Sequence, residues 1–396
     1  MSSSRVIELV EYEVKYLDSS ELSPELGEKL WRLYSTQIDV DFPSPKVGNR
    51  WLLRPQGWVG YIPLTSDFGI SLKPKVRLRT LFEMLEVAYR LKSFRFLEGI
   101  FDCASISAYY DRLARVLARR VLDRGRRGYF RRYVEQADSL SFICGKMDIA
   151  SMSRTPWHVR IPCEYQEHTG DIVDNRILTW TLSRISKSSV CTSDTLRLVR
   201  KAYRDLSGIA ATVPVEPADC VGRLYDRLND DYEPLHALCR FFLEQAGPTH
   251  ALGDQRMLPF LVDMARLFEL FVSEWLRLHL LSNWQLHSQE KVFVDKDSYV
   301  SFCIDLVLTK TATGQPVYVL DTKYKAPSHP ASEDVQQIIA YAVSKGCSEA
   351  ILIYPRQLRQ PLDDWVGGIH VRSMAFPLDR DLDTAGHELL QEIGVT

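Results

Sequence analysis

Cysteine patterns that mark metal sites or disulfide frameworks are missing from this 396-residue chain. The eight cysteines are scattered, and none forms a CxxC pair or a Cys/His ligand set. This distribution predicts reduced thiols in a cytoplasmic protein and argues against a zinc site. Long apolar runs are missing too, so no membrane span is expected. Residues 1–16 mix acidic with apolar side chains and contain no apolar signal-peptide core.

An excess of charge of one sign is also lacking. Lysine and arginine number 49 against 51 acidic residues, which gives a formal net charge of −2. The total therefore does not predict a nucleic-acid-binding protein. The stretch from Arg112 to Arg132 is nevertheless strongly basic, because it contains nine arginines and only one acid, Asp123. Such a face suits DNA, an acidic partner or plain solvation, and its position in the sequence does not decide between them.

Length and composition predict two or three globular domains, since 45% of the residues are hydrophobic. Residues 1–75 are rich in β-branched and aromatic residues separated by turn signals, which predicts a β-rich domain. Residues 76–250 show mainly helical periodicity, and residues 251–396 alternate between helical and strand patterns. The expected boundary lies at residues 247–253. The predicted fold class is an α+β multidomain protein with no internal repeat.

Hydrophobic periodicity predicts the elements within these domains. In the middle domain we expect helices at 78–89, 106–122, 174–186, 193–206 and 234–245, with Asp123 and Gly125 breaking the second of them. In the last domain we expect, in order, a helix at 257–281, strands at 284–293, 298–309 and 316–324, a helix at 332–344 capped by Ser332, and strands at 350–354 and 368–375.

Two carboxylates and a lysine stand in unusual places in the last domain. Asp305 lies within an apolar strand, and Asp321 and Lys323 lie two residues apart at the end of the next strand. Side chains at i and i+2 share a face, and a hairpin would bring Asp305 to that face. Unpaired carboxylates among apolar strands are costly. The group therefore predicts a site that a divalent cation neutralises.

Oxygen ligands of this kind suit Mg²⁺, with Mn²⁺ as an alternative. We predict that Asp305, Asp321 and the carbonyl of Thr322 hold the ion, which would polarise a scissile phosphate and activate a water. Lys323 would position that water or stabilise the phosphate charge. The alternative is two ordinary salt-bridged aspartates, because a D-x-K triplet occurs often by chance. The apolar run before the triplet, the helix after it and Glu269 on the leading helix favour a nuclease site.

The order helix, three strands, helix, strand resembles the αβββαβ mixed-sheet core of the PD-(D/E)XK nucleases. Within that superfamily, the motifs resemble the McrC family. They are Leu267-Phe-Glu-Leu-Phe271, Asp305, Asp321-Thr-Lys-Tyr-Lys325 and Asp334-Val-Gln-Gln-Ile-Ile-Ala-Tyr341. Weaker similarities lie upstream at 57–61, 70–75, 127–133, 144–148, 163–165 and 174–178. One departure is Cys303, where many relatives carry Arg-Pro before the aspartate.

The resemblance implies roles for two further residues. Glu269 would support the metal site from the leading helix, and Gln337 would face the site together with Tyr341. For Gln337, a buried amide that caps a strand is an equal alternative. The resemblance thus implies a catalytic set of Asp305, Asp321, Lys323, Glu269 and Gln337.

The resemblance also implies a partnership. Residues 251–396 would form a PD-(D/E)XK endonuclease that cuts modified DNA in a type IV restriction system. Residues 1–75 would engage a hexameric AAA+ GTPase of the McrB type and stimulate it. The chain has no GxxxxGK[ST] loop, so GTP is expected only through the partner. Cutting both strands needs two active sites, which predicts a transient homodimer.

Two other functions compete with this hypothesis. A stand-alone PD-(D/E)XK nuclease of repair or recombination would need only the last third of the chain, so the long N-terminal part argues against it. A non-catalytic assembly subunit would have no need for Asp305, Asp321 and Lys323. The sequence does not indicate which modified base is targeted.

Overall fold

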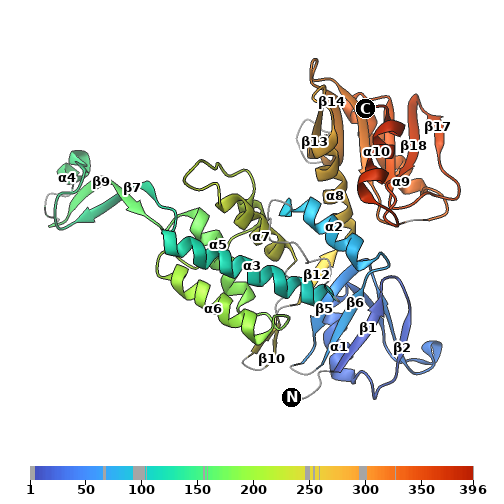
Figure 1. Ribbon diagram of the computed structural model, residues 1–396, viewed down its shortest axis with the longest axis horizontal. Helices are drawn as coiled ribbons and strands as arrows, with labels where there is room; N and C mark the ends of the chain where they lie inside the picture. Colours follow the sequence, from blue (N-terminus) through green and yellow to red (C-terminus); the bar gives the residue numbers. More distant parts are fainter. Residues whose placement is uncertain are drawn as a thin grey trace. The chain divides into compact units, whose positions relative to one another are not determined.

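The chain forms two compact units in the computed structural model (Figure 1). The structure describes residues 5–65, 68–91, 103, 105–154, 157, 159–245, 250–252, 255–257, 259–293, 301–325 and 327–395. The larger unit combines Met1–Ser107 with Gln245–Thr396, and the inserted unit is Ala108–Glu244. Contacts therefore group residues 76–107 with both ends of the chain, whereas the sequence placed them in a middle domain. Most of the boundary expected at 247–253 lies outside the described residues.

The N-terminal part of the larger unit is β-rich, as expected. One sheet has the order β1 (Arg5–Val10), β6 (Phe68–Lys73), β5 (Trp58–Pro63), β12 (Phe260–Asp263), and another has the order β2 (Lys15–Leu17), β4 (Trp51–Pro55), β3 (Ile38–Asp41). A short 3-10 turn, η1 (Pro45–Val47), precedes β4. The two sheets share one buried cluster, which includes Trp51, Ile62 and Leu261.

Helix α1 (Pro24–Tyr34) was not anticipated in this β-rich region. Ser23 and Pro24 stand at its N-cap and first position, where both residue types are favoured. Leu30 and Tyr34, one turn apart, are fully buried. The helix therefore follows local start signals and an apolar face that aromatic and β-branched residues on either side obscured.

Strand β12 corrects the helix predicted at 257–281. Phe260 pairs with Tyr61 and Asp263 pairs with Trp58 in an antiparallel ladder. Helix α8 (Met264–His279) begins only after this strand, because the carboxylate of Asp263 accepts the N–H groups of the first turn. Gly60 makes the close pairing feasible: its φ is +144°, and a Cβ there would lie 2.0 Å from a main-chain oxygen of β12.

The C-terminal part is built on one mixed six-stranded sheet. Its order is β13 (Trp284–Phe293), β14 (Ser301–Lys310), β15 (Pro316–Thr322), β16 (Glu349–Tyr354), β18 (Ile369–Ala375), β17 (Asp363–Val366). The first three strands are antiparallel neighbours, and β15, β16 and β18 run parallel. The expected order of helix, three strands, helix, strand is therefore present.

Helices cover this sheet. Helix α9 (Ser332–Lys345) packs Ile338 and Ala342 into a buried cluster with sheet residues such as Val319. Its N-cap is Ala331 and not Ser332, and no side chain caps it. Helix α8 packs against α2 (Leu78–Ala88), β13 and β15, while α10 (Leu382–Ile393), which was not predicted, packs against β18.

The inserted unit contains four of the five helices predicted in the middle domain, together with an unpredicted arm. Its helical elements are α3 (Ile106–Arg127), α5 (Val173–Ile185), α6 (Ser193–Ser207), η4 (Pro217–Cys220) and α7 (Tyr232–Glu244). Helix α3 passes through Asp123 and Gly125, the predicted breakers. It ends before Gly128, whose φ is +92°. Arg126 pairs with Asp123 within the added turn.

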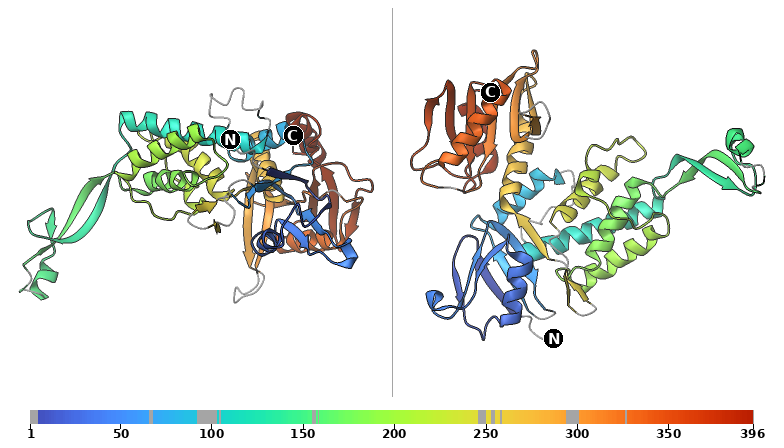
Figure 2. Two further views of the ribbon diagram at one scale, coloured as in Figure 1. Left: turned by 90° about the horizontal axis from the view of Figure 1, so that it is seen from below. Right: turned by 180° about the vertical axis from the view of Figure 1, so that it is seen from behind.

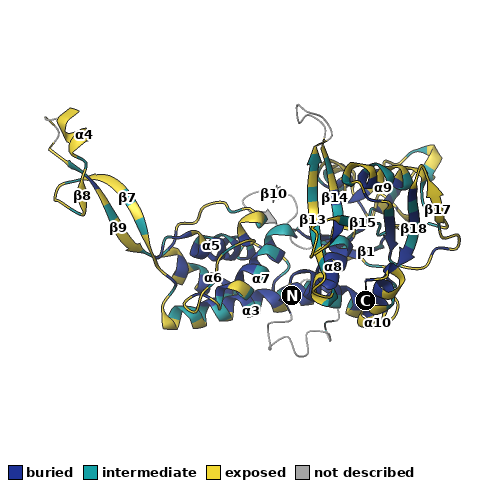
Figure 3. Cartoon of the chain, turned by 90° about the horizontal axis from the view of Figure 1, so that it is seen from above, coloured by how far each residue is buried: buried dark blue, intermediate teal, exposed yellow. Residues whose placement is uncertain are grey.

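The arm follows α3 and extends away from the helices of its own unit (Figure 2). It consists of β7 (Arg132–Leu140), β8 (Lys146–Met147), α4 (Ile149–Arg154) and β9 (Ile161–Thr169), with β7 and β9 paired along their whole lengths. Both long strands are largely exposed (Figure 3). Among the helices in the described part of the chain, none is long and apolar enough to cross a membrane.

Candidate active site

The hairpin of β14 and β15 places the two predicted aspartates opposite each other. Leu306 pairs with Leu320, so the antiparallel register sets Asp305 across from Asp321. Cross-strand partners point to the same face. Thr322 fixes Asp305, since its N–H and its hydroxyl lie 3.0 and 3.2 Å from Asp305 Oδ2. The two aspartates therefore share one face of the sheet, as the predicted hairpin requires.

Lys323 lies on the same face and joins the hairpin to α9. Its Nζ is 2.7 Å from Asp321 Oδ2, 3.0 Å from Gln337 Oε1 and 3.8 Å from Asp334 Oδ1. Gln337 Nε2 donates to the Tyr341 hydroxyl at 2.7 Å. Gln337 thus faces the lysine, and its side chain bonds to Lys323 and Tyr341 and not to the end of a strand.

Glu269 approaches the hairpin from α8, and Gln289 Nε2 donates to it. Gln289 was not recognised in the sequence. Its neighbours pair as Ser288 with Leu306 and Glu290 with Ile304, which sets Gln289 opposite Asp305. Its φ of +53° is unusual for a residue with a side chain and marks local strain. Cys303 Sγ donates to Gln289 Oε1 at 3.1 Å, so the cysteine that departs from the family pattern helps to hold this side chain.

Two further polar residues at the site were also missed. Asp334 is buried in the first turn of α9, and Lys325 Nζ lies 3.1 Å from its carboxylate. In the sequence, Asp334 was noted only as the first residue of the motif that ends at Tyr341, without a role of its own. Asp334 lies three residues before Gln337, and Gln337 lies four residues before Tyr341, so all three share one face of the helix. This spacing could have identified Asp334 as part of the site.

Burial and mutual repulsion shape the electrostatics of this group. Burial, and then the charge of Asp305, raise the pKa of Asp321 to about 7. The same two causes raise the pKa of Glu269 to about 7. Burial also raises the pKa of Asp305, against the hydrogen bonds from Thr322. Burial would lower the pKa of Lys323, but the neighbouring carboxylates, Asp321 first, outweigh it and raise that pKa. The site therefore contains more carboxylates than positively charged groups to balance them.

The donor set fits a hard divalent cation. Asp305 and Asp321 offer only oxygen atoms, which Mg²⁺ prefers. Within the described residues, no three His, Cys, Asp or Glu side chains are arranged to hold an ion by themselves. Two aspartates would therefore leave the other coordination positions to water, phosphate or main-chain oxygens, and Mg²⁺ commonly keeps several waters. The carbonyl of Thr322 as a ligand stays a prediction.

Comparisons with known proteins agree with the predicted family. The family described as "McrBC 5-methylcytosine restriction system component" matches residues 53–355. A similar solved structure is a half-complex from a tetradecameric assembly of Thermococcus gammatolerans McrB AAA+ hexamers with bound McrC. It is 16% identical, with 98% of this chain and 100% of that chain covered, at a TM-score of 0.51. A cryo-EM structure of the Thermococcus gammatolerans McrBC complex is also 16% identical, with coverages of 69% and 87% and a TM-score of 0.40. No curated protein matches.

At 16% identity, the first of these structures supports a common fold and nothing finer. The family match is stronger evidence, because residues 53–355 make up more than half of the chain. This protein belongs to the McrBC restriction-system family.

Proposed function

We propose that this chain is the DNA-cleaving subunit of a modification-dependent (type IV) restriction system, with a PD-(D/E)XK nuclease core in residues 251–396. The observation that carries the proposal is the pair Asp305 and Asp321 opposite each other on one hairpin, with Lys323 2.7 Å from Asp321. An acid-rich, buried group with raised carboxyl pKa values is typical of a functional site. The order of elements from α8 to β16 supports the same assignment.

Each residue has a role in the proposed reaction, which is hydrolysis of a DNA phosphodiester bond. Asp305 and Asp321, with the Thr322 carbonyl, would hold Mg²⁺ or Mn²⁺, and a bound ion supplies the positive charge that polarises the phosphate. Thr322 orients Asp305 through two hydrogen bonds. Lys323 would orient the attacking water and stabilise the charge that develops on phosphate. Gln337 holds the lysine in place.

We propose that Glu269 supports the site as an acid–base group close to neutral pH. Its raised pKa places the switch between its neutral and charged forms near pH 7. Gln289 fixes one of its oxygens. Binding of a cation to the aspartates would favour the charged form of Glu269, because it would offset their repulsion.

We also propose that the chain works with an AAA+ GTPase hexamer of the McrB type. In the similar structure, McrC is bound to McrB AAA+ hexamers. GTP would then act only through the partner. Residues 1–75 are our first candidate for the contact. They expose Trp31 and Phe42, whose rings lie 5.8 Å apart, and Tyr16. Exposed aromatic rings are enriched in protein interfaces.

The arm of the inserted unit is a second candidate for the contact. Trp157 and Val159 are 74% and 95% exposed, and several further apolar residues near them are exposed as well. These further residues are Phe142, Ile143, Met147, Ile149 and Met152. So large a gathering of apolar side chains in solvent is typical of a surface that binds another protein.

A cleavage assay tests the proposed activity. The full-length chain would be incubated with methylated or unmethylated plasmid and Mg²⁺, Mn²⁺ or EDTA, with and without an AAA+ GTPase and GTP. We expect cleavage of modified DNA that requires the metal, the partner and GTP. Cleavage without the partner would instead indicate a stand-alone nuclease. Stimulation of GTP hydrolysis without any cleavage would indicate an assembly subunit.

Matched tryptophan variants test the two contact surfaces. Trp31→Ala and Trp157→Ala each remove one exposed ring, so neither is expected to unfold the chain. If residues 1–75 engage the partner, Trp31→Ala lowers the stimulated GTPase rate and Trp157→Ala does not. The opposite result would assign the contact to the arm.

Sedimentation of the chain on DNA with two modified sites would test the transient homodimer.

A further inference from the structure

Two connections join the N-terminal sheet to the candidate active site within the larger unit. The first is covalent. Strand β12 completes the N-terminal sheet and leads directly into α8, the helix that carries Glu269. The main-chain N–H of Met264 donates to the carbonyl of Gly57 at 3.0 Å, which ties the start of α8 to the turn before β5. One side of the site is thus anchored on this sheet.

The second connection is a single side-chain contact. Glu11, just after β1, is fully buried, and its Oε2 lies 3.2 Å from both the Tyr324 hydroxyl and the Lys75 N–H. Its own N–H donates to the carbonyl of Lys73 at 3.0 Å, so Glu11 is fixed to the N-terminal sheet. Tyr324 directly follows Lys323 in the chain. The contact therefore reaches the segment that carries the D-x-K triplet.

Tyr324 is also held on its ring side. Its ring centroid lies 6.1 Å from that of Phe268 on α8. Tyr324 follows Lys323 directly, so its anchored ring restrains the main chain beside the lysine. The N–H of Lys323 donates to the carbonyl of Ile353 at 2.9 Å. The main chain at Lys323 is therefore held by one hydrogen bond to β16 and by the anchorage of the next residue.

Burying a glutamate between two parts of a protein costs free energy. Burial raises the pKa of Glu11, and in the described part of the chain its Oε1 has no hydrogen-bond partner. An apolar side chain of similar volume would pack without that cost, but it would give no directional contact. Glu11 and Tyr324 are also among the residues that line a cleft of about 680 Å³.

We propose that Glu11 and Tyr324 are positioning residues for DNA cleavage, which hold the Asp321–Lys323 segment at a fixed place relative to the N-terminal sheet. The inference rests on the proposed nuclease function for its catalytic consequence. Loss of the contact lets the strand end move, and the Lys323 ammonium then leaves its place between Asp321 and Gln337. A displacement of that size is enough to slow a reaction that depends on position.

The test uses full-length protein and two readouts. Hydrogen exchange of the 321–325 segment reports its anchorage, and single-turnover cleavage at saturating DNA reports the chemical step. Tyr324→Phe removes only the hydroxyl. Glu11→Leu removes the acceptor, and Glu11→Gln keeps one. Tyr318→Phe is the matched control, because this tyrosine lies in β15, the strand that leads into the segment, and its hydroxyl makes no hydrogen bond within the described residues.

We expect Tyr324→Phe and Glu11→Leu each to speed exchange of the segment and to lower the cleavage rate about tenfold, with the KM for DNA unchanged. The double variant should be no slower than either single one, since both remove one contact. Glu11→Gln should restore most of the rate, and Tyr318→Phe should match the wild type.

Each other outcome is decisive. Unchanged exchange in Tyr324→Phe overturns the proposal whether or not the wild type cuts DNA. Faster exchange with an unchanged cleavage rate overturns the catalytic role. If the wild-type chain does not cleave at all while exchange rises as expected, the nuclease function fails and the anchoring contact stands.

Discussion

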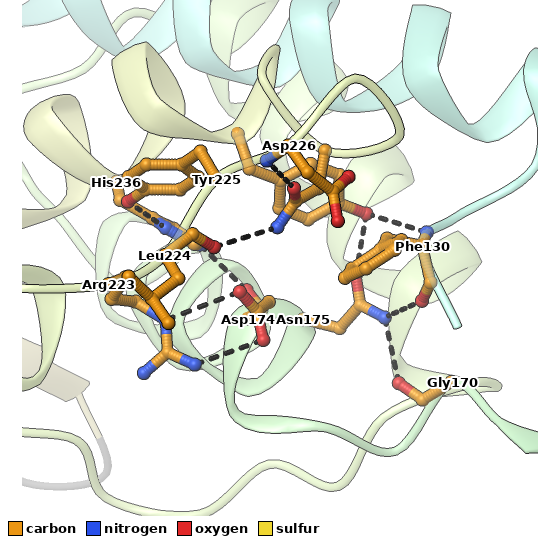
Figure 4. A network of polar contacts seen from close by, with 11 residues as sticks. Phe130, Gly170, Asp174, Asn175, Arg223, Leu224, Tyr225, Asp226 and His236 are labelled. Carbon is orange, nitrogen blue, oxygen red and sulfur yellow. Dashed lines mark hydrogen bonds and ion pairs between the residues drawn. The ribbon is translucent and has the colours of Figure 1, made fainter. Parts of the chain in front are cut away.

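Two buried aspartates in this protein differ in the charged groups that surround them. Asp174, at the start of α5 in the inserted unit, is 1% exposed, and Asp321, at the end of β15, is 2% exposed. The Arg223 guanidinium donates a hydrogen bond to each carboxylate oxygen of Asp174, at 3.2 and 3.0 Å (Figure 4). Asp321 instead shares one lysine with Asp334 and faces Asp305 across the hairpin.

The network around Asp174 is complete within the fold. His236 Nε2 donates to its main-chain carbonyl at 3.0 Å, and the Tyr225 hydroxyl donates to Nδ1 of the same histidine at 2.8 Å. Asn175, the next residue, bonds to the carbonyls of Phe130 and Gly170, which flank the two long strands of the arm. Burial of an acid therefore does not identify a functional site by itself. A shortage of positively charged groups around a buried acid does indicate such a site, because a bound cation can supply the missing charge.

The largest effect that this comparison predicts is on catalysis. Asp321→Asn keeps the shape of the side chain and removes a metal ligand, and Lys323→Ala removes a charge that matters mainly in the transition state. We expect each to lower the cleavage rate by about 10³-fold or more. Plasmid cleavage and thermal unfolding would be measured together.

The control is Asp364→Asn, at an exposed position of the same sheet, which should cut DNA as the wild type does. Folding of Asp321→Asn should be unimpaired, since the change relieves repulsion with Asp305. Wild-type cleavage by either Asp321→Asn or Lys323→Ala would remove the D-x-K triplet from the mechanism.

The second prediction concerns pH and the inserted unit. Burial lowers the pKa of His236 to about 4, from about 6.5 in an unfolded chain. Between these values the unfolded state binds a proton that the folded state does not, so stability falls as the pH is lowered from about 6.5 to about 4. We expect a loss of about 3 kcal/mol, read as faster hydrogen exchange in α5. His236→Gln should flatten this pH dependence.

The candidate site should respond to pH with the opposite sign. The pKa values of Asp321 and Glu269 are raised to about 7, so the folded state binds more protons than the unfolded state down to about pH 4. In metal-free protein, exchange around β15 should therefore slow as the pH falls through this range. Mg²⁺ should reduce the effect, because it favours the ionised acids. If the hydrogen-exchange rates of both units changed with pH in the same direction, the predicted difference between the units would be wrong.

A third, smaller effect is expected for Asn175→Ala. The change removes the hydrogen bonds to the Phe130 and Gly170 carbonyls and the one that the Tyr232 hydroxyl donates at 2.7 Å. We expect a loss of about 2 kcal/mol in the inserted unit, measured by urea unfolding. Tyr203→Phe, which removes an exposed hydroxyl contact, is the control and should change stability by less than about 0.5 kcal/mol. Equal losses in both variants would show that the network is not the source of the effect.

The smallest effects concern the basic stretch of α3. Arg126 pairs with Asp123 on the surface, and Arg126→Ala should change stability by at most about 0.5 kcal/mol. Arg124 is used by the fold, since it contacts Asp231, the Leu228 carbonyl and the ring of Tyr232. Arg124→Ala should cost more, about 1 to 2 kcal/mol. DNA binding measured by anisotropy with Arg126→Ala then distinguishes a DNA-contacting face from a solvated one.

The sequence allowed the hairpin site to be predicted because its evidence is local. Strand parity placed Asp321 and Lys323 together, and the apolar strand around Asp305 indicated that the acid was buried. The long strands of the arm were not predicted, because β7 is mostly polar and exposed, and in β9 only Ile161, Cys163 and Tyr165 form a short apolar alternation. The positive φ of Gln289 has no residue signature at all.

Strand β12 was missed for a different physical reason. Its four residues form a strand only because β5 offers a free edge about 200 residues earlier in the chain. Read by themselves, Phe260, Leu261 and Val262 continue the apolar pattern of the helix that follows. The Asp174 network is equally invisible in the sequence, because its members come from segments far apart in the chain.

This late strand also sets an order of events on the ribosome. When β5 leaves the exit tunnel, its edge has no neighbour, and Phe260–Asp263 follow only after roughly 10 to 40 seconds at ~5–20 residues per second. The inserted unit is made entirely within that interval and can fold first. Asp305, Asp321 and Lys323 are synthesised later still. Under the proposed function, a nascent chain that stops before β12 holds none of the cleavage residues and is harmless to the cell's own DNA.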